Sequence, residues 1–303
     1  MARSVGPSVG WFKQALVQHL PWVGSSYLLG VVGQYRRHKA AVGGFLFLLA
    51  LLLTAAVGPY LVPHDPYRMD LSKITLAPSW LHPLGTDEVG RDLLSRLVEG
   101  SRFTLLLSLA SVALAVSLGL WMGVVAGYYG GWIDTVLSRL LDVWMALPGF
   151  LIAIAVIAIL GPGLYNVVFA VGAYTTPHFA RLARGSVLAQ KGEDYVLAAR
   201  AVGVGNRRIM WRHVLPNILA PIIVQFTLRL ATAILTVSAL SFLGLGAQPP
   251  SPEWGVIIST GRNFIWTSPH LVVFPGVAIM LTVLAFNLVG DGLRDSLDPR
   301  LRH

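Results

Sequence analysis

Six apolar runs divide this sequence, and most have the length that a helix needs to cross a lipid bilayer. About 20 apolar residues span the hydrocarbon core, and a chain in lipid must satisfy its backbone hydrogen bonds internally. The fourth run is short and contains Pro177. None alternates with a period of two, so we expect an all-α polytopic membrane protein with six transmembrane helices and not a β-barrel. The runs cover approximately residues 40–62, 103–128, 136–160, 164–179, 214–243 and 271–290.

The composition supports a membrane class. The chain is 55% hydrophobic and 12% charged, whereas soluble domains carry about 25% charged residues. The first apolar run is too long for the core of a signal peptide, so we expect it to remain as a helix. The absence of cysteine excludes disulfides, thiolate metal sites and a cysteine nucleophile.

The basic residues indicate the topology. Of the 23 Lys and Arg residues, 16 fall on the side of the predicted spans that carries both termini. Because cytoplasmic loops are enriched in Lys and Arg, we expect both termini to be cytoplasmic. The net charge of +9 is explained by this asymmetry, and we expect no nucleic-acid partner.

These boundaries predict five parts. They are a cytoplasmic segment 1–39, a first transmembrane helix 40–62, an extracytoplasmic loop 63–102, a core domain 103–292 with five spans and an inner loop 181–213, and a cytoplasmic tail 293–303. In the first part, Val9, Phe12, Leu16 and Leu20 recur at helical spacing. This pattern suits a helix in the membrane interface, and a loosely ordered tail is the alternative.

The inner loop has the pattern of two short helices joined by a glycine turn. Glu193 and Asp194 favour a helix start, Gly203 ends the first helix, and Asn206 is placed to cap a second one that runs to Pro216. Ala198, Ala199 and Ala201 keep the first helix thin, so that another protein can approach its backbone closely. We therefore interpret the loop as a docking element.

The same loop resembles the EAA loop of bacterial ABC importer permeases, which is a coupling helix that seats in a groove of the ATP-binding subunit. Residues 194–203 read Asp-Tyr-Val-Leu-Ala-Ala-Arg-Ala-Val-Gly and residues 212–217 read Arg-His-Val-Leu-Pro-Asn. Leu197 stands where the pattern has Glu, and His213 where it has Ile. The resemblance implies these coupling residues: Asp194, Tyr195, Ala198, Ala199, Arg200, Gly203, Arg207, His213 and Pro216.

Three further segments, 84–96, 242–255 and 287–300, resemble the C-type permease of the dipeptide, oligopeptide and nickel branch of that family. The resemblance implies a type I importer permease fold in the bacterial inner membrane, paired with a sister permease. It also implies two ATP-binding subunits inside, which hold ATP and Mg, and a substrate-binding protein outside. This chain itself would need no cofactor. The implied substrate is a dipeptide or oligopeptide, with nickel or another small solute as the alternative.

A charge lies inside the fifth predicted span. Gln225, Arg229, Thr232 and Thr236 form one helical stripe in this apolar segment. Since a charge near the middle of a bilayer is costly, Arg229 is a candidate functional residue. The stripe either lines the translocation path or makes hydrogen bonds between helices.

Other polar features leave simpler interpretations open. The charged stretch 87–96 either contacts a binding protein or forms a solvated interfacial helix with Asp92 and Arg96 paired at i,i+4. Glycines at positions 119, 123 and 127 predict close packing against another helix, and Pro148 and Pro177 predict kinks.

Several classes of function lack their sequence signals. There is no phosphate-binding loop ending in Gly-Lys-Ser or Gly-Lys-Thr, so energy from ATP must come through a partner. His178, His213 and His270 have no acidic or His partner at metal-ligand spacing, so we expect no metal site and no catalytic site. An ion-coupled secondary transporter is the rival class, but the predicted spans offer only Asp142 and Asp291 as carboxylates, both near cytoplasmic ends.

Overall fold

The computed structural model describes residues 25–297, with side chains described from residue 30 onward, and it is helical. The predicted interfacial helix within residues 1–24 lies outside the described residues. Within the described part, the only β-pairing is an isolated bridge between Thr86 and Asp92. The helices are α2 (Ser25–Arg37), α3 (Lys39–Val57), α4 (Leu93–Tyr129), α5 (Gly131–Met145), α6 (Gly149–Leu160), α7 (Leu164–Lys191), α8 (Asp194–Ala201), α9 (Asn206–Ile209), α10 (Leu215–Phe242), α11 (Trp254–Gly261) and α12 (His270–Leu297), with short turns η1 (Gly58–Tyr60), η2 (Leu71–Lys73), η3 (Met210–Val214) and η4 (Arg262–Phe264).

The structure confirms the predicted all-helical architecture with several long apolar helices. Four helical segments of the described chain are long and apolar enough to cross a membrane, and α5 and α6 together make a fifth if this bent pair counts as one span. Helix α7 has 28 residues but carries Arg181, Arg184 and Lys191 in its last turns. The count of six spans therefore stays a prediction.

The helices extend beyond the apolar runs. Helix α4 begins at Leu93, α7 continues to Lys191 and α12 to Leu297, so helix covers parts of the predicted loops 63–102 and 181–213 and of the predicted tail 293–303. The physical reason is that hydropathy marks the part of a helix that suits lipid, whereas backbone hydrogen bonding carries a helix on into polar surroundings. The sides of the membrane assigned to these parts stay predictions. Pro177 lies inside α7 without ending it.

The third apolar run is not one straight helix. It breaks before Gly149, and α5 and α6 meet at an angle of 90°. Pro148 stands at the N-terminal cap of α6, because its ring prevents the preceding helix from continuing. At Pro148 the predicted kink is therefore a right-angle break between two separate helices.

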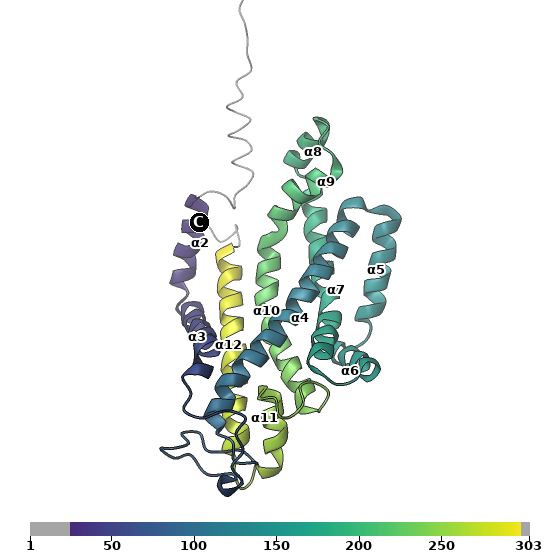
Figure 1. The fold of residues 1–303 in the computed structure, drawn as a ribbon. Coiled ribbons are helices and arrows are strands. Elements are labelled where there is room, and N and C mark those ends of the chain that lie inside the picture. The colour runs from purple at the N-terminus through teal and green to yellow at the C-terminus, as the bar shows by residue number, and fades with distance from the viewer. Residues whose placement is uncertain (1–24, 298–303) are drawn as a thin grey trace, which may run out of the picture.

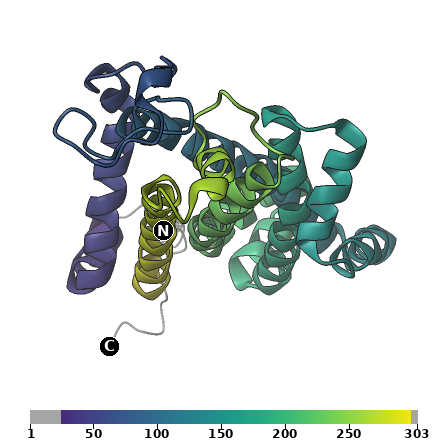
Figure 2. The same ribbon diagram turned by 90° about the horizontal axis from the view of Figure 1, so that it is seen from below.

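Helices α4 and α7 pack closely because glycines face the α7 backbone. A Cβ atom at Gly119 would lie 2.6 Å from the Thr176 carbonyl oxygen, and one at Gly127 would lie 2.9 Å from the Arg184 carbonyl oxygen, with Gly123 against Ala180 between them. Only glycine allows this approach, so the predicted small-residue ridge is confirmed. Figure 2 shows α3 and α12 toward one edge of the molecule and α5 at the opposite edge.

The two ends of the helix bundle carry different elements. Helices α8 and α9 form the tip at one end, and α11 lies with the long segment 58–92 at the other end (Figure 1). Helix α2 and the last turn of α12 lie toward the α8 end (Figure 1), where Gln34 Nε2 donates to the Asp295 carbonyl oxygen at 3.1 Å. Both ends of the described chain are therefore on the same side of the bundle as α8.

Candidate functional site

The turn after α8 has the geometry of a Schellman motif, which ends many helices. Gly203 has a φ of 82°, its N–H donates to the Arg200 carbonyl oxygen at 3.0 Å, and the Val204 N–H donates to the Ala199 carbonyl oxygen at 3.0 Å. A positive φ at this position is the reason for glycine. The predicted helix end at Gly203 is confirmed.

A hydrogen-bond network joins α8 to the two long helices beside it. The Tyr195 hydroxyl donates to Gln190 Oε1 of α7 at 2.6 Å, and Asn217 Nδ2 in the first turn of α10 donates to the Tyr195 oxygen at 3.2 Å. Asn217 Nδ2 also donates to the His213 carbonyl oxygen at 2.6 Å. Burial raises the pKa of the Tyr195 hydroxyl above its ordinary value, so it stays protonated and able to donate. This group, Gln190, Tyr195, His213 and Asn217, is named the tyrosine network below.

The two faces of α8 have different environments. Val196 is fully buried and Ala199 is 9% exposed, and both belong to the main hydrophobic core together with Ile209. The prediction that Ala199 presents an outer docking surface is therefore wrong, because α8 folds back onto α9 and covers it. The opposite face of α8 and the residue after its C-terminus are exposed. This exposed surface consists of Asp194, Leu197, Ala198, Arg200, Ala201 and Val202.

The second short helix differs from the prediction at both ends. Gly205 and not Asn206 is its N-cap, and Asn206 Oδ1 accepts a hydrogen bond from the Tyr128 hydroxyl of α4 at 2.9 Å. The chain then passes through the π-helical turn η3 into α10 without a break at Pro216. His213 and Pro216 are half-buried.

A shallow hollow lies beside this second helix. Arg207, Arg208 and Arg212 line it with Trp211, whose side chain is exposed, and with the backbone of Gly205 and Asn206. The arginines make the hollow basic. Helix α9, which carries Arg207 and Arg208, lies beside α8 at the tip of the bundle (Figure 1). Together the exposed α8 face and this hollow are named the tip surface below.

The polar stripe of α10 is divided between two kinds of contact. With its amide oxygen facing the guanidinium, Gln225 accepts from Arg229 Nε at 2.8 Å and from Nη2 at 3.3 Å. Thr236 Oγ1 lies 3.0 Å from the Tyr174 hydroxyl of α7, while Thr232 is exposed. Thr236 therefore makes a hydrogen bond between helices, as one of the two interpretations of the stripe predicted. Arg229 is half-buried and forms no ion pair with a carboxylate of the described residues.

Most of the charged stretch 87–96 is buried, which neither interpretation from the sequence anticipated. Asp92 does not pair with Arg96: it caps α4 by accepting from the Ser95 N–H at 2.8 Å. Arg96, only 1% exposed, lies with its Nε 3.3 Å from Asp87 Oδ2 and donates to the carbonyl oxygens of Pro66 and Pro250, each at 3.4 Å. The stretch therefore joins distant loops and is not a solvated helix.

Another buried carboxyl group, that of Glu253, was not identified from the sequence. It is fully buried at the N-cap of α11, where its side chain accepts from Thr104 Oγ1 at 3.1 Å, Ser238 Oγ at 3.0 Å and the Val256 N–H at 3.1 Å. These donors come from α4, α10 and α11. A Glu next to proline-rich turns gives no sequence signal for such burial. Glu253 holds three helices together at the end opposite to the tip surface.

Comparison with protein families decides the class of this chain. Residues 115–303 match the family described as binding-protein-dependent transport system inner membrane component, and residues 26–78 match the N-terminal transmembrane domain of oligopeptide transport permease C. The chain belongs to the binding-protein-dependent transport permeases. The resemblance seen in the coupling motif is therefore confirmed.

Individual permeases of this family align over nearly the whole chain. The di/tripeptide transport system permease protein DppC of Pseudomonas aeruginosa is 45% identical over 89% of this chain and 91% of its own length. The glutathione transport system permease protein GsiD of Pectobacterium atrosepticum is 43% identical over 96% of this chain and 99% of its own length.

The fold is also that of a solved transporter subunit. A chain of the inward-facing MetNI methionine ABC transporter superposes with a TM-score of 0.55 at 19% identity, covering 68% of this permease and 98% of that chain. At this identity the likeness concerns the fold alone.

Proposed function

We propose that this permease forms half of the translocation pore of an ATP-driven, binding-protein-dependent importer of dipeptides or other short peptides. Family membership carries the proposal. The tyrosine network, which joins α8 to α10, supports a mechanism in which movement of α8 is passed to α10. The chain itself is not the ATPase, because its sequence lacks a phosphate-binding loop.

The tip surface is the proposed contact with the ATP-binding subunits, which would hold ATP and Mg. Leu197, Ala198 and Val202 give it a small apolar surface, and Arg200 and Arg207 flank that surface with positive charge. A partner that moves α8 when it closes on ATP would move the first turn of α10 as well, because Tyr195 and Asn217 are hydrogen-bonded. Helix α10 carries the stripe of Gln225 and Arg229, so movement at the tip reaches the proposed translocation path.

The proposed topology places the tip surface in the cytoplasm. Both ends of the described chain lie toward the same end as α8 (Figure 1), which agrees with the Lys and Arg asymmetry of the sequence. Segment 58–92 and α11 would then face the extracytoplasmic side and a substrate-binding protein. A sister permease would complete the pore in the bacterial inner membrane.

The choice of a peptide substrate rests on the relatives described above. They are named for di/tripeptides and for glutathione, which is itself a tripeptide. These names support a short peptide over a nickel chelate.

Uptake by reconstituted vesicles tests the proposal. The complete complex is placed in proteoliposomes with its binding protein outside and ATP inside, and uptake of a labelled di- or tripeptide is measured. We expect uptake that requires ATP, the ATP-binding subunits and the binding protein together. Uptake driven by a proton or sodium gradient without ATP, or uptake of metal chelates only, would contradict it.

A further inference from the structure

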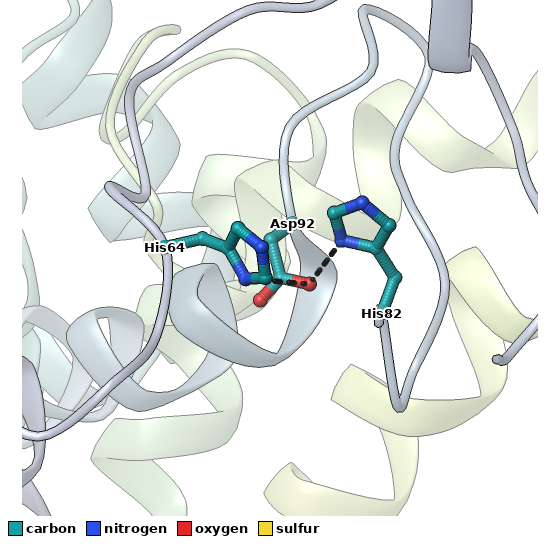
Figure 3. Close-up of side chains that lie close together, drawn as sticks. All are labelled: His64, His82 and Asp92. Carbon is teal, nitrogen blue, oxygen red and sulfur yellow. Dashed lines mark hydrogen bonds and ion pairs between the residues drawn. The ribbon is translucent and has the colours of Figure 1, made fainter. Parts of the chain in front are cut away.

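Two histidines and an aspartate from separated parts of the sequence meet beside the start of α4 (Figure 3). His64 follows α3 and η1, His82 lies in the long segment 58–92, and Asp92 is the N-cap of α4. Both rings point toward the Asp92 carboxylate from different sides (Figure 3). One ligand atom from each residue lies within 4.8 Å of the other two.

A hydrogen bond explains only part of this arrangement. His82 Nδ1 lies 2.9 Å from Asp92 Oδ1, which is an ordinary hydrogen-bond distance. His64 Nδ1 lies 3.9 Å from the same oxygen, which is too long for a hydrogen bond, and this buried nitrogen has no hydrogen-bond partner among the described residues. A buried polar atom without a hydrogen-bond partner is costly, so this nitrogen is available to bind a ligand.

We propose that His64, His82 and Asp92 bind one divalent transition-metal ion of the zinc class. Zinc lies about 2.0–2.2 Å from imidazole nitrogen and carboxylate oxygen, so neighbouring ligand atoms around a tetrahedral ion are roughly 3.3 Å apart. The observed separations of 2.9 and 3.9 Å fall on either side of this value. The third separation, between the ligand nitrogens of the two histidines, is at most 4.8 Å, so the site would contract around the ion when it binds.

The donor set selects among cations. Two imidazoles and one carboxylate suit zinc or a neighbouring transition metal, whereas Mg²⁺ and Ca²⁺ prefer oxygen ligands throughout. The side chains of His82 and Asp92 are 5% and 1% exposed, but that of His64 is 30% exposed. The open side at His64 leaves room for water as the fourth ligand.

Hydrogen bonds from Ser95 hold the Asp92 carboxylate in place, whereas the His82 ring is less constrained. Asp92 Oδ2 accepts from the Ser95 N–H at 2.8 Å and from Ser95 Oγ at 2.7 Å, which holds Oδ1 toward the two histidines. His82 Nε2, in contrast, has no partner among the described residues. Because outer hydrogen bonds contribute about 10–100-fold to metal affinity, we expect weaker binding than at a fully supported structural zinc site.

The proposed ion would join three points of the chain at the end of the bundle opposite to the tip surface (Figure 1). It would fix the long segment 58–92, which has only short helical turns of its own, onto the first turn of α4. The role we assign to the ion is therefore structural. This inference departs from the expectation of no metal site, because that expectation considered His178, His213 and His270 and looked for partners only at close spacing in the sequence.

Zinc binding to the intact chain tests the inference. The chain is purified from membranes with the subunits that accompany it, stripped with a chelator, titrated with Zn²⁺ and analysed for bound metal by mass spectrometry. The wild type and the variants His64→Gln and His38→Gln are compared. His38 is the matched control, because its Nε2 lies 3.8 Å from Asp295 Oδ2 in an exposed pair far from the cluster. Metal carried by accompanying subunits cancels in this comparison.

We expect one zinc ion per chain more in the wild type and in His38→Gln than in His64→Gln, whose affinity should fall at least about tenfold. His64 is partly exposed and its Nδ1 has no hydrogen-bond partner within residues 30–297, so His64→Gln should fold and keep its elution profile. Zinc should also raise the apparent unfolding temperature of the wild type and not that of His64→Gln. Equal zinc content and equal thermal shifts in all three proteins would overturn the inference.

Discussion

The Tyr195 oxygen lies 3.2 Å from Asn217 Nδ2, so the short helix α8 is hydrogen-bonded to the first turn of α10. Tyr195 and Asn217 belong to the two segments, 194–203 and 212–217, that resemble the EAA loop. Tyr195 also donates to Gln190 of α7, which places its hydroxyl between three helices. Hydrogen bonds of Tyr195 therefore connect α8, which carries part of the tip surface, to α10, which carries Arg229.

Tyr195→Phe should weaken this connection without removing the ring. The variant loses bonds worth about 0.5–1.5 kcal/mol each, which is too little to unfold the chain. We expect normal assembly with the ATP-binding subunits but a clear loss of substrate-stimulated ATP hydrolysis. Tyr165→Phe is the control, because Tyr165 is 82% exposed on α7. Equal ATP hydrolysis by the two variants would show that the hydroxyl has no coupling role.

Gly203→Val should distort the turn between α8 and α9. A β-branched residue at a φ of 82° costs roughly 1–3 kcal/mol, although no atom lies within 4 Å of the position that its Cβ would occupy. We expect a membrane-inserted permease that binds the ATP-binding subunits weakly and shows little stimulated ATP hydrolysis.

Gly203→Asn separates backbone strain from side-chain size at the same position. Asparagine tolerates the left-handed conformation better than other residues, so this variant should retain most of the coupled activity. If valine and asparagine reduce binding of the ATP-binding subunits to the same extent, backbone conformation at Gly203 is not the cause.

Arg229→Leu should separate transport from packing. Leucine is less costly in lipid than arginine, so insertion should be intact, whereas loss of the guanidinium beside Gln225 should change peptide uptake. Thr236→Val is the comparison, because it removes the bond to Tyr174 and should lower stability by about 1 kcal/mol with little effect on uptake. Uptake in vesicles and thermal unfolding measure the two effects. Unchanged uptake by Arg229→Leu would assign the whole stripe to packing.

Glu253 should make stability depend on pH. Burial raises the pKa of its carboxyl above the ordinary value of 4.5, against the opposing effect of its hydrogen bonds. Because the folded state then holds the proton more tightly than the unfolded state, this contribution to stability is complete below about pH 4.5 and is lost as the pH rises through the folded-state pKa.

Glu253→Gln should remove this slope from the unfolding temperature measured against pH. Glu193→Gln is the control, because Glu193 is exposed and should leave the slope of the wild type unchanged. An identical slope in Glu253→Gln and the wild type would mean that another group causes the pH dependence.

The sequence predicted the features that depend on local patterns. Long apolar runs indicated membrane helices, the glycines at 119, 123 and 127 indicated a close helix contact, and Gly203 indicated the end of a helix. Each of these depends on residues within a few turns of one helix, where sequence spacing and physical contact correspond.

The features that the sequence could not show depend on contacts between distant segments. Ala198 and Ala199 are neighbours of the same type, and only the packing of α8 against α9 exposes one and buries the other. Arg96 finds its partners in the loops at Pro66 and Pro250, and His64 meets Asp92 across a long loop. No local spacing predicts such pairs.

The most direct test of the proposed coupling uses the absence of cysteine from the sequence, since any introduced cysteine is then unique in this chain. Ala198→Cys and Val202→Cys place a thiol on the exposed side of the tip surface, and Ala199→Cys places one in the core as the control. Labelling by a maleimide is measured with and without the ATP-binding subunits. We expect both exposed thiols to be labelled in the permease alone and protected in the complex, with slow labelling of Ala199→Cys throughout. Equal labelling of Ala198→Cys and Val202→Cys in both states would contradict the assignment of α8 as the coupling element.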